Sequence, residues 1–169
     1  MMSSKFPTWF LLRDGLIVTI VVIAWVLWWP VSAGAGPLAD FAGVMLGIGG
    51  AAVAFVCHEW GHLLGAIASG GRYTLPPGLA SPFLFSFDSR RNSQRQFVIM
   101  SLAGFAVTGA ALVVVYWCLP ADALATRVVR GAVLFLASLT VFLEVPLLVL
   151  SLVTGSILQQ AEVFPVEEP

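Results

Sequence analysis

The chain has 169 residues, of which 59% are hydrophobic and only 10% are charged, and its formal net charge is −1. A soluble domain is about 45–50% apolar and about 25% charged, so this composition predicts an integral membrane protein, with a single domain over residues 1–169. The slightly acidic balance excludes a nucleic-acid-binding role, which needs a basic patch. Cys57 and Cys118 both lie in apolar segments and do not indicate a disulfide framework.

Membrane-spanning helices need roughly 20 mostly apolar residues. Four apolar segments meet this requirement, at residues 16–31, 41–68, 97–119 and 128–158. The first is short, but the tryptophan pair near its end suits the aromatic belt of a membrane interface. The fourth is long enough to tilt, or to break near Pro146. The predicted fold class is therefore an all-α polytopic bundle of about four transmembrane helices.

The first of these segments has a second interpretation, as a cleaved signal peptide. Lys5 and Arg13 precede it, and the small residues at 33–35 resemble a signal-peptidase site. Two tryptophans and Pro30 close the apolar stretch, which is unusual for a cleaved signal. We therefore expect the segment to be retained as a peripheral helix.

The basic residues predict the orientation, because Lys and Arg concentrate in cytoplasmic loops. With four spans, the N-terminus, the 69–96 segment and the C-terminus share one side of the membrane. That side holds six basic residues and the other side two, which predicts that the N-terminus lies in the cytoplasm. The membrane itself is expected to be a plasma or inner membrane. The six are Lys5, Arg13, Arg72, Arg90, Arg91 and Arg95, and the two are Arg127 and Arg130.

The cytoplasmic 69–96 segment is broken by glycines and prolines, yet it is partly apolar. Residues 84–88 alternate large apolar with small or polar side chains, which predicts a short strand. Two interpretations remain open: an apolar hairpin at the bilayer edge, or an ordinary surface loop. The apolar edge could accept an extended substrate by strand addition. The last residues, 161–169, predict a solvated acidic tail.

The second span contains His58-Glu59-Trp60-Gly61-His62, an HExxH sequence that includes both histidines of the chain. Residues four apart share one helix face, so His58 and His62 can bind one Zn²⁺ ion. Glu59 lies roughly 100° around the helix, where it can act as general base on a zinc-held water. The alternative is a pair of core histidines satisfied by neighbouring groups, although burying two imidazoles and a carboxylate only for packing is costly.

A third zinc ligand is predicted at Glu144, the only acidic residue of the fourth apolar segment. Ionisable residues at membrane depth usually serve function, and glutamate is a good zinc ligand. Another role in the site, or a purely structural carboxyl, remains an alternative for Glu144. Asp88 is the second candidate ligand, although it could instead pair with Arg90 or Arg91 at the surface.

Small and hydroxyl residues indicate how the helices approach one another. Gly43 with Gly47, and Gly61 with Gly65, form pairs four residues apart that permit close helix packing. Thr108 in the third span could hydrogen-bond an active-site histidine, or it could be an ordinary interhelical contact.

The stretch HEWGHLLGAIASGG, residues 58–71, resembles the zinc-motif helix of the site-2 protease family of intramembrane metalloproteases. Residues 95–104 resemble the start of the next core helix of that family. The resemblance covers roughly residues 43–158, which correspond to three core helices. It departs from the family at Phe105, where a proline is usual, and at Thr108, near the position of an asparagine.

The family's third ligand is an aspartate in a leucine-aspartate-glycine motif, and here Thr154 precedes Gly155 at the corresponding place. The resemblance implies a zinc enzyme that hydrolyses peptide bonds of transmembrane or membrane-associated polypeptides, with water entering from the cytoplasm. A catalytically degenerate relative that only binds or regulates is the alternative: the missing aspartate favours it and the retained Glu59 opposes it. A metal-transport protein is disfavoured, because the other predicted helices offer no polar path.

Overall fold

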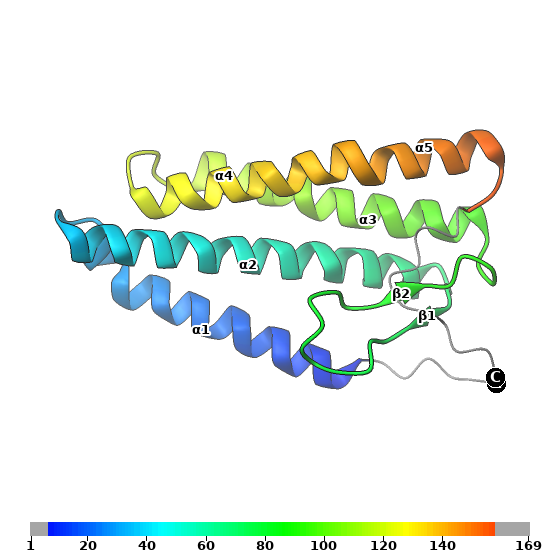
Figure 1. Cartoon of the computed structure of the whole chain (residues 1–169), viewed down its shortest axis with the longest axis horizontal. Coiled ribbons are helices and arrows are strands. Elements are labelled where there is room, and N and C mark those ends of the chain that lie inside the picture. The colour runs from blue at the N-terminus through cyan, green and yellow to red at the C-terminus, as the bar shows by residue number, and fades with distance from the viewer. Residues whose placement is uncertain (1–6, 158–169) are drawn as a thin grey trace.

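The computed structural model describes residues 7–157, which form a bundle of four long helical rods with a small hairpin at one end (Figure 1). Each rod is long and apolar enough to cross a membrane, which confirms the predicted fold class. The first two rods are α1 (Thr8–Ser32) and α2 (Pro37–Ala68). The third is α3 (Gln94–Val113) with the π-helical η1 (Val114–Cys118), and the fourth is α4 (Leu124–Leu139), the π-helical η2 (Thr140–Glu144) and α5 (Val145–Thr154).

All four rods begin earlier than predicted, and the fourth ends at Thr154 rather than at residue 158, because Gly155 takes a left-handed conformation that ends the helix. Helix α2 begins at Pro37, and a proline fits the first turn, where its missing N–H has no helical partner to lose. Helix α3 begins after a capping box, in which Ser93 and Gln96 satisfy each other's backbone N–H groups. Helix α1 includes Arg13 and Asp14, whose charges hid the helix start from a hydropathy argument. Lys5, residue 158 and the predicted acidic tail lie outside the described residues.

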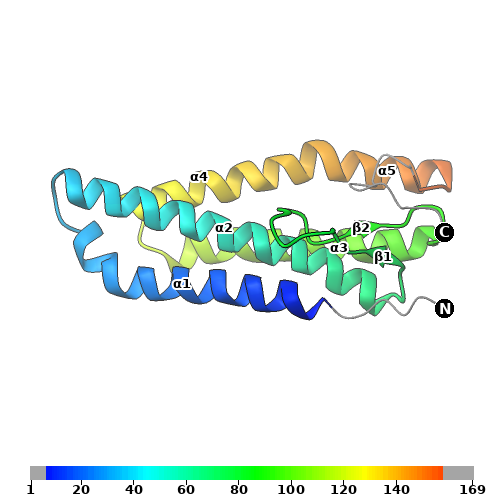
Figure 2. The ribbon, with the colours of Figure 1, turned by 60° about the horizontal axis from the view of Figure 1, so that its bottom comes forward.

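Helix α2 is the centre of the bundle and lies between α1 and the α4–α5 rod in both views (Figures 1 and 2). Its glycines allow this close packing. A Cβ atom on Gly47 would lie 2.6 Å from Cγ1 of Val128 in α4, and one on Gly65 would lie 2.9 Å from Cα of Met100 in α3. The prediction that these glycines serve helix packing is confirmed: the first half of α2 packs on α4 and the second half on α3.

The segment between α2 and α3 is a hairpin folded against the bundle. Strand β1 (Tyr73–Thr74) pairs antiparallel with β2 (Ser86–Phe87), which lies inside the predicted strand. Leu84 is buried in one cluster with Phe10 of α1 and Leu63 of α2. The hairpin therefore shares its apolar core with the helices.

The start of α1, the hairpin and the end of α5 lie at one end of the bundle (Figures 1 and 2). This arrangement is the one that four antiparallel spans require. It brings the described basic residues of the 69–96 segment and Arg13 to the same end, as the charge pattern predicts.

Gly47→Ala should destabilise the bundle by about 1–3 kcal/mol, because the added methyl overlaps Val128 on α4. Gly131→Ala is the matched control: it is also a helical glycine, but nothing lies within 4 Å of an added Cβ. That variant should be neutral or more stable by up to about 1 kcal/mol, since alanine has the higher helix propensity. Thermal unfolding in detergent measures both, and equal midpoints for the two variants would contradict the packing described.

Candidate metal centre

The histidines of the HExxH motif lie one helical turn apart on α2 and face the interior of the bundle. The two rings meet edge to face, with their centroids 4.5 Å apart. The Nε2 atoms of His58 and His62 are 3.1 Å apart, and His58 is only 3% exposed. The spacing of four residues has therefore placed both ring nitrogens at one point, as predicted.

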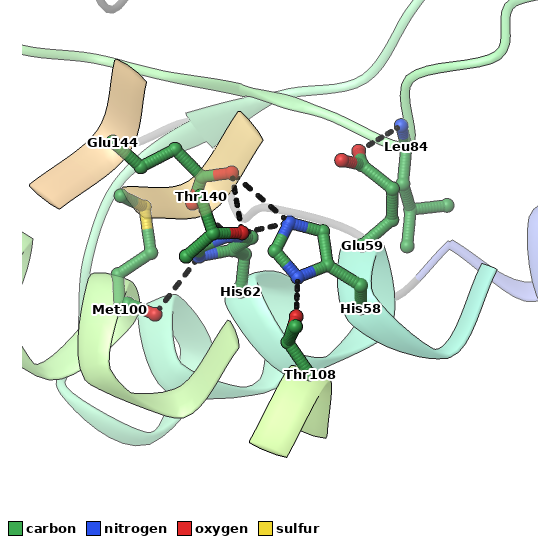
Figure 3. A network of polar contacts seen from close by, with 8 residues as sticks. All are labelled: His58, Glu59, His62, Leu84, Met100, Thr108, Thr140 and Glu144. Carbon is green, nitrogen blue, oxygen red and sulfur yellow. Dashed lines mark hydrogen bonds and ion pairs between the residues drawn. The ribbon is translucent and has the colours of Figure 1, made fainter. Parts of the chain in front are cut away.

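Glu144 reaches the same point from the fourth rod (Figure 3). One of its carboxylate oxygens, Oε1, lies 3.3 Å from Nε2 of His58, and the other, Oε2, lies 3.1 Å from Nε2 of His62. Glu144 ends the π-helical turn η2, two residues before Pro146. A proline lacks an N–H and its ring clashes with the carbonyl four residues earlier, so a locally widened turn is the expected response of the helix.

The ligand atoms of these three residues lie close enough together to share one tetrahedral metal ion. Zinc binds imidazole nitrogen and carboxylate oxygen at about 2.0–2.2 Å, so two ligand atoms at a tetrahedral angle lie about 3.3–3.5 Å apart. The two nitrogens are 3.1 Å apart, and each lies close to a different carboxylate oxygen, His62 at 3.1 Å from Oε2 and His58 at 3.3 Å from Oε1. His58, His62 and Glu144 could therefore hold a metal together, with a fourth position left for water or substrate.

The Nδ1 atoms of both histidines are held by α3, which orients the rings. Nδ1 of His62 lies 3.1 Å from the carbonyl oxygen of Met100. A carbonyl only accepts, so Nδ1 carries the proton and the lone pair of the neutral ring is on Nε2. Nδ1 of His58 lies 2.8 Å from Oγ1 of Thr108, so of the two interpretations left open for that threonine the structure shows the histidine contact. Metal-binding histidines commonly have such a partner at the other nitrogen.

Thr140 is a supporting residue that the sequence analysis missed. Its hydroxyl is buried and donates to Oε1 of Glu144 at 3.3 Å. The available signal was spacing, since Thr140 precedes Glu144 by four residues and so lies on the same helix face.

Glu59 lies beside the cluster, and its carboxylate points toward the hairpin and away from Glu144 (Figure 3). Its Oε2 atom accepts a hydrogen bond from the backbone N–H of Leu84 at 3.2 Å. The predicted general base is therefore on the same helix as the two histidines, but its carboxylate is hydrogen-bonded to the hairpin in this structure.

The second candidate ligand, Asp88, belongs to a different part of the molecule. Its Oδ1 atom accepts from the backbone N–H groups of Arg90 and Arg91, and Oδ2 lies 3.6 Å from Nε of Arg91. The predicted alternative, a pairing with Arg90 or Arg91, is therefore observed, although Asp88 is buried rather than at the surface. Thr154, at the place of the family's aspartate, is exposed at the end of α5, and its hydroxyl donates to the carbonyl of Leu150.

Comparisons with protein-family models, with curated proteins and with solved structures found no match to this chain. The similarity to the site-2 protease family accordingly remains a resemblance, carried mainly by residues 58–71.

Gly104→Ala should weaken divalent-metal binding by about 10–100-fold, the usual effect of disturbing a group that supports a ligand. An added Cβ at Gly104 would overlap the His62 ring and push it away from Glu144. Gly109→Ala is the matched control on the same helix, with nothing within 4 Å of its added Cβ. Calorimetric titration with Zn²⁺ or Co²⁺ measures the two affinities. A Gly104→Ala protein that binds metal as tightly as Gly109→Ala would contradict this geometry.

Proposed function

We propose that this protein is a zinc-dependent intramembrane metalloprotease that hydrolyses peptide bonds of transmembrane or membrane-associated polypeptides. The observation that carries the proposal is the meeting of His58, His62 and Glu144 at separations of 3.1–3.3 Å, inside helices apolar enough to span a membrane. Two imidazoles and one carboxylate are a ligand set of catalytic zinc sites. Glu59, next to His58 in the chain, supplies the acid–base group that hydrolysis needs.

Each of these side chains has a separate task in the proposed reaction. His58, His62 and Glu144 would hold the zinc ion, which when bound polarises a carbonyl oxygen and makes water more acidic. Glu59 takes the proton of the attacking water and delivers it to the leaving amine. Thr108 and the Met100 carbonyl keep the imidazoles oriented, and their hydrogen bonds make the rings better ligands.

The location of the cluster narrows the class of substrate. The ligands lie on α2 and on the turn before α5, both in rods long and apolar enough to span a membrane. A polypeptide that reaches them must therefore enter the bilayer or lie at its surface. We place the hairpin and the N-terminus in the cytoplasm of a plasma or inner membrane, because the basic residues gather at that end.

Zinc analysis of the purified protein tests the ligand set. Wild type should contain one zinc per chain, His62→Ala should contain none, and Glu144→Gln should bind with greatly reduced affinity because it loses a charged ligand. Asp88→Asn is the control and should keep its zinc, since Asp88 pairs with the 90–91 backbone. A folded wild type that takes up no zinc would exclude the metalloprotease. An unchanged affinity in Glu144→Gln would place the third ligand elsewhere.

Cleavage assays test the role of Glu59. Glu59→Gln should lower kcat by about 10²–10⁴-fold, the usual contribution of a general base, while its zinc content stays that of wild type. The probe is a labelled single-span peptide placed in the same vesicles as the protein, with fragments separated by mass. Equal rates for wild type and Glu59→Gln, or zinc binding without any cleavage, would favour the degenerate relative that only binds or regulates.

A further inference from the structure

The first half of α1 carries a buried carboxylate, paired with a partly exposed arginine, that contacts the proposed metal-binding helix. Asp14 is only 3% exposed; its Oδ1 atom accepts from Nε of Arg13 at 2.7 Å. Its Oδ2 atom accepts from the indole Nε1 of Trp60 at 2.8 Å. Trp60 is the residue directly after Glu59 in the HExxH motif. A carboxylate buried in an apolar bundle is costly unless it is paired, so this pair marks a specific contact between the first helix and the motif.

The same arginine holds the hairpin. Nη1 of Arg13 donates to the carbonyl oxygens of Leu79 at 2.7 Å and of Ser81 at 2.8 Å. One guanidinium thus joins Asp14 to two backbone groups more than sixty residues away in the chain. Phe10, one turn earlier on α1, adds an apolar contact, because it shares a buried cluster with Leu84.

Residues 79–84, which Arg13 holds in place, in turn bind the proposed general base. The N–H of Leu84, three residues beyond Ser81, donates to Oε2 of Glu59 and draws the carboxylate toward the hairpin (Figure 3). Two adjacent residues of α2 are therefore linked through α1 and the hairpin. Trp60 is hydrogen-bonded to Asp14, which pairs with Arg13, and Arg13 in turn binds the carbonyl of Ser81. Three residues further along the chain, the N–H of Leu84 binds Glu59.

We propose that Arg13 and Asp14 are positioning residues that keep residues 79–84 over Glu59 and so hold the general base away from the metal ligands. Release of this segment frees the carboxylate to turn toward His58 and His62, and the first helix thereby controls when the site becomes active. The inference rests on the proposed protease function for its catalytic consequence, whereas the contact itself can be tested without any reaction.

Backbone hydrogen exchange followed by mass spectrometry tests the contact, with the full chain in lipid vesicles. The variants are Arg13→Ala and Asp14→Asn, and the control is Arg127→Ala, an exposed arginine on α4 at the opposite end of the bundle. Peptides covering residues 79–87 should exchange about tenfold faster in both variants, as local opening becomes easier. Peptides from residues 128–150 should be unchanged, which also shows that the variants are folded.

The same samples are assayed for zinc and for cleavage of the labelled single-span peptide. Zinc content should equal that of wild type, and kcat should rise severalfold in Arg13→Ala, because opening of the segment is then easier. Unchanged exchange in residues 79–87 would overturn the contact. Faster exchange with equal or slower cleavage would overturn its role in withholding Glu59. A wild type without zinc, or without cleavage that depends on Glu59, would instead refute the protease function, and the exchange data would still decide the contact.

Discussion

Close contact between α2 and α3 is the constraint on which the site depends. Gly104 offers no side chain beneath the His62 ring, so the ring lies against the α3 backbone and its Nδ1 reaches the Met100 carbonyl. The same closeness lets Thr108 reach His58 one turn along. Side chains in an apolar medium cannot rely on water for hydrogen bonds, so each imidazole takes a protein partner at Nδ1, and the Met100 carbonyl leaves the lone pair of a neutral His62 ring on Nε2. The packing of α2 on α3 therefore also sets the orientation of the two imidazole rings.

The candidate site divides into a fixed part and a part that depends on the hairpin. His58, His62 and Glu144 lie on helices and are each supported by a neighbouring group of the bundle. Glu59 shares the helix of the histidines, yet its carboxylate is held by a backbone N–H of the segment between α2 and α3. Ligands on rigid elements keep their geometry, whereas loops open at a lower free energy. This division places the three candidate metal ligands on the helices and leaves the position of the Glu59 carboxylate to the hairpin.

Much of the fold and part of the site could be predicted from the sequence, because they depend on local periodicity. Apolar length gave the four rods, and the spacing of four residues placed His58 and His62 on one face. The single acid of the fourth segment identified Glu144 as their neighbour. The partnership of Asp14 with Trp60 could not be predicted, since it joins two helices whose register is set by packing. The start of α1 was predicted too late as well. A hydropathy criterion ends a span at charged residues, whereas Arg13 and Asp14 lie within the helix and pair with each other.

The turn that carries Glu144 has two very different sides. Its inner side holds the carboxylate and the buried Thr140, while its outer side exposes three large apolar residues in a row, Val141, Phe142 and Leu143. In a bilayer those side chains would meet acyl chains directly. Only a single helical turn then separates lipid from the cluster, and such π-helical turns inside α-helices are rare and frequent at functional sites. Changes in acyl-chain order or bilayer thickness would therefore act on the backbone of the turn that orients the Glu144 carboxylate. The lipid composition of the membrane could in this way alter the geometry of the cluster.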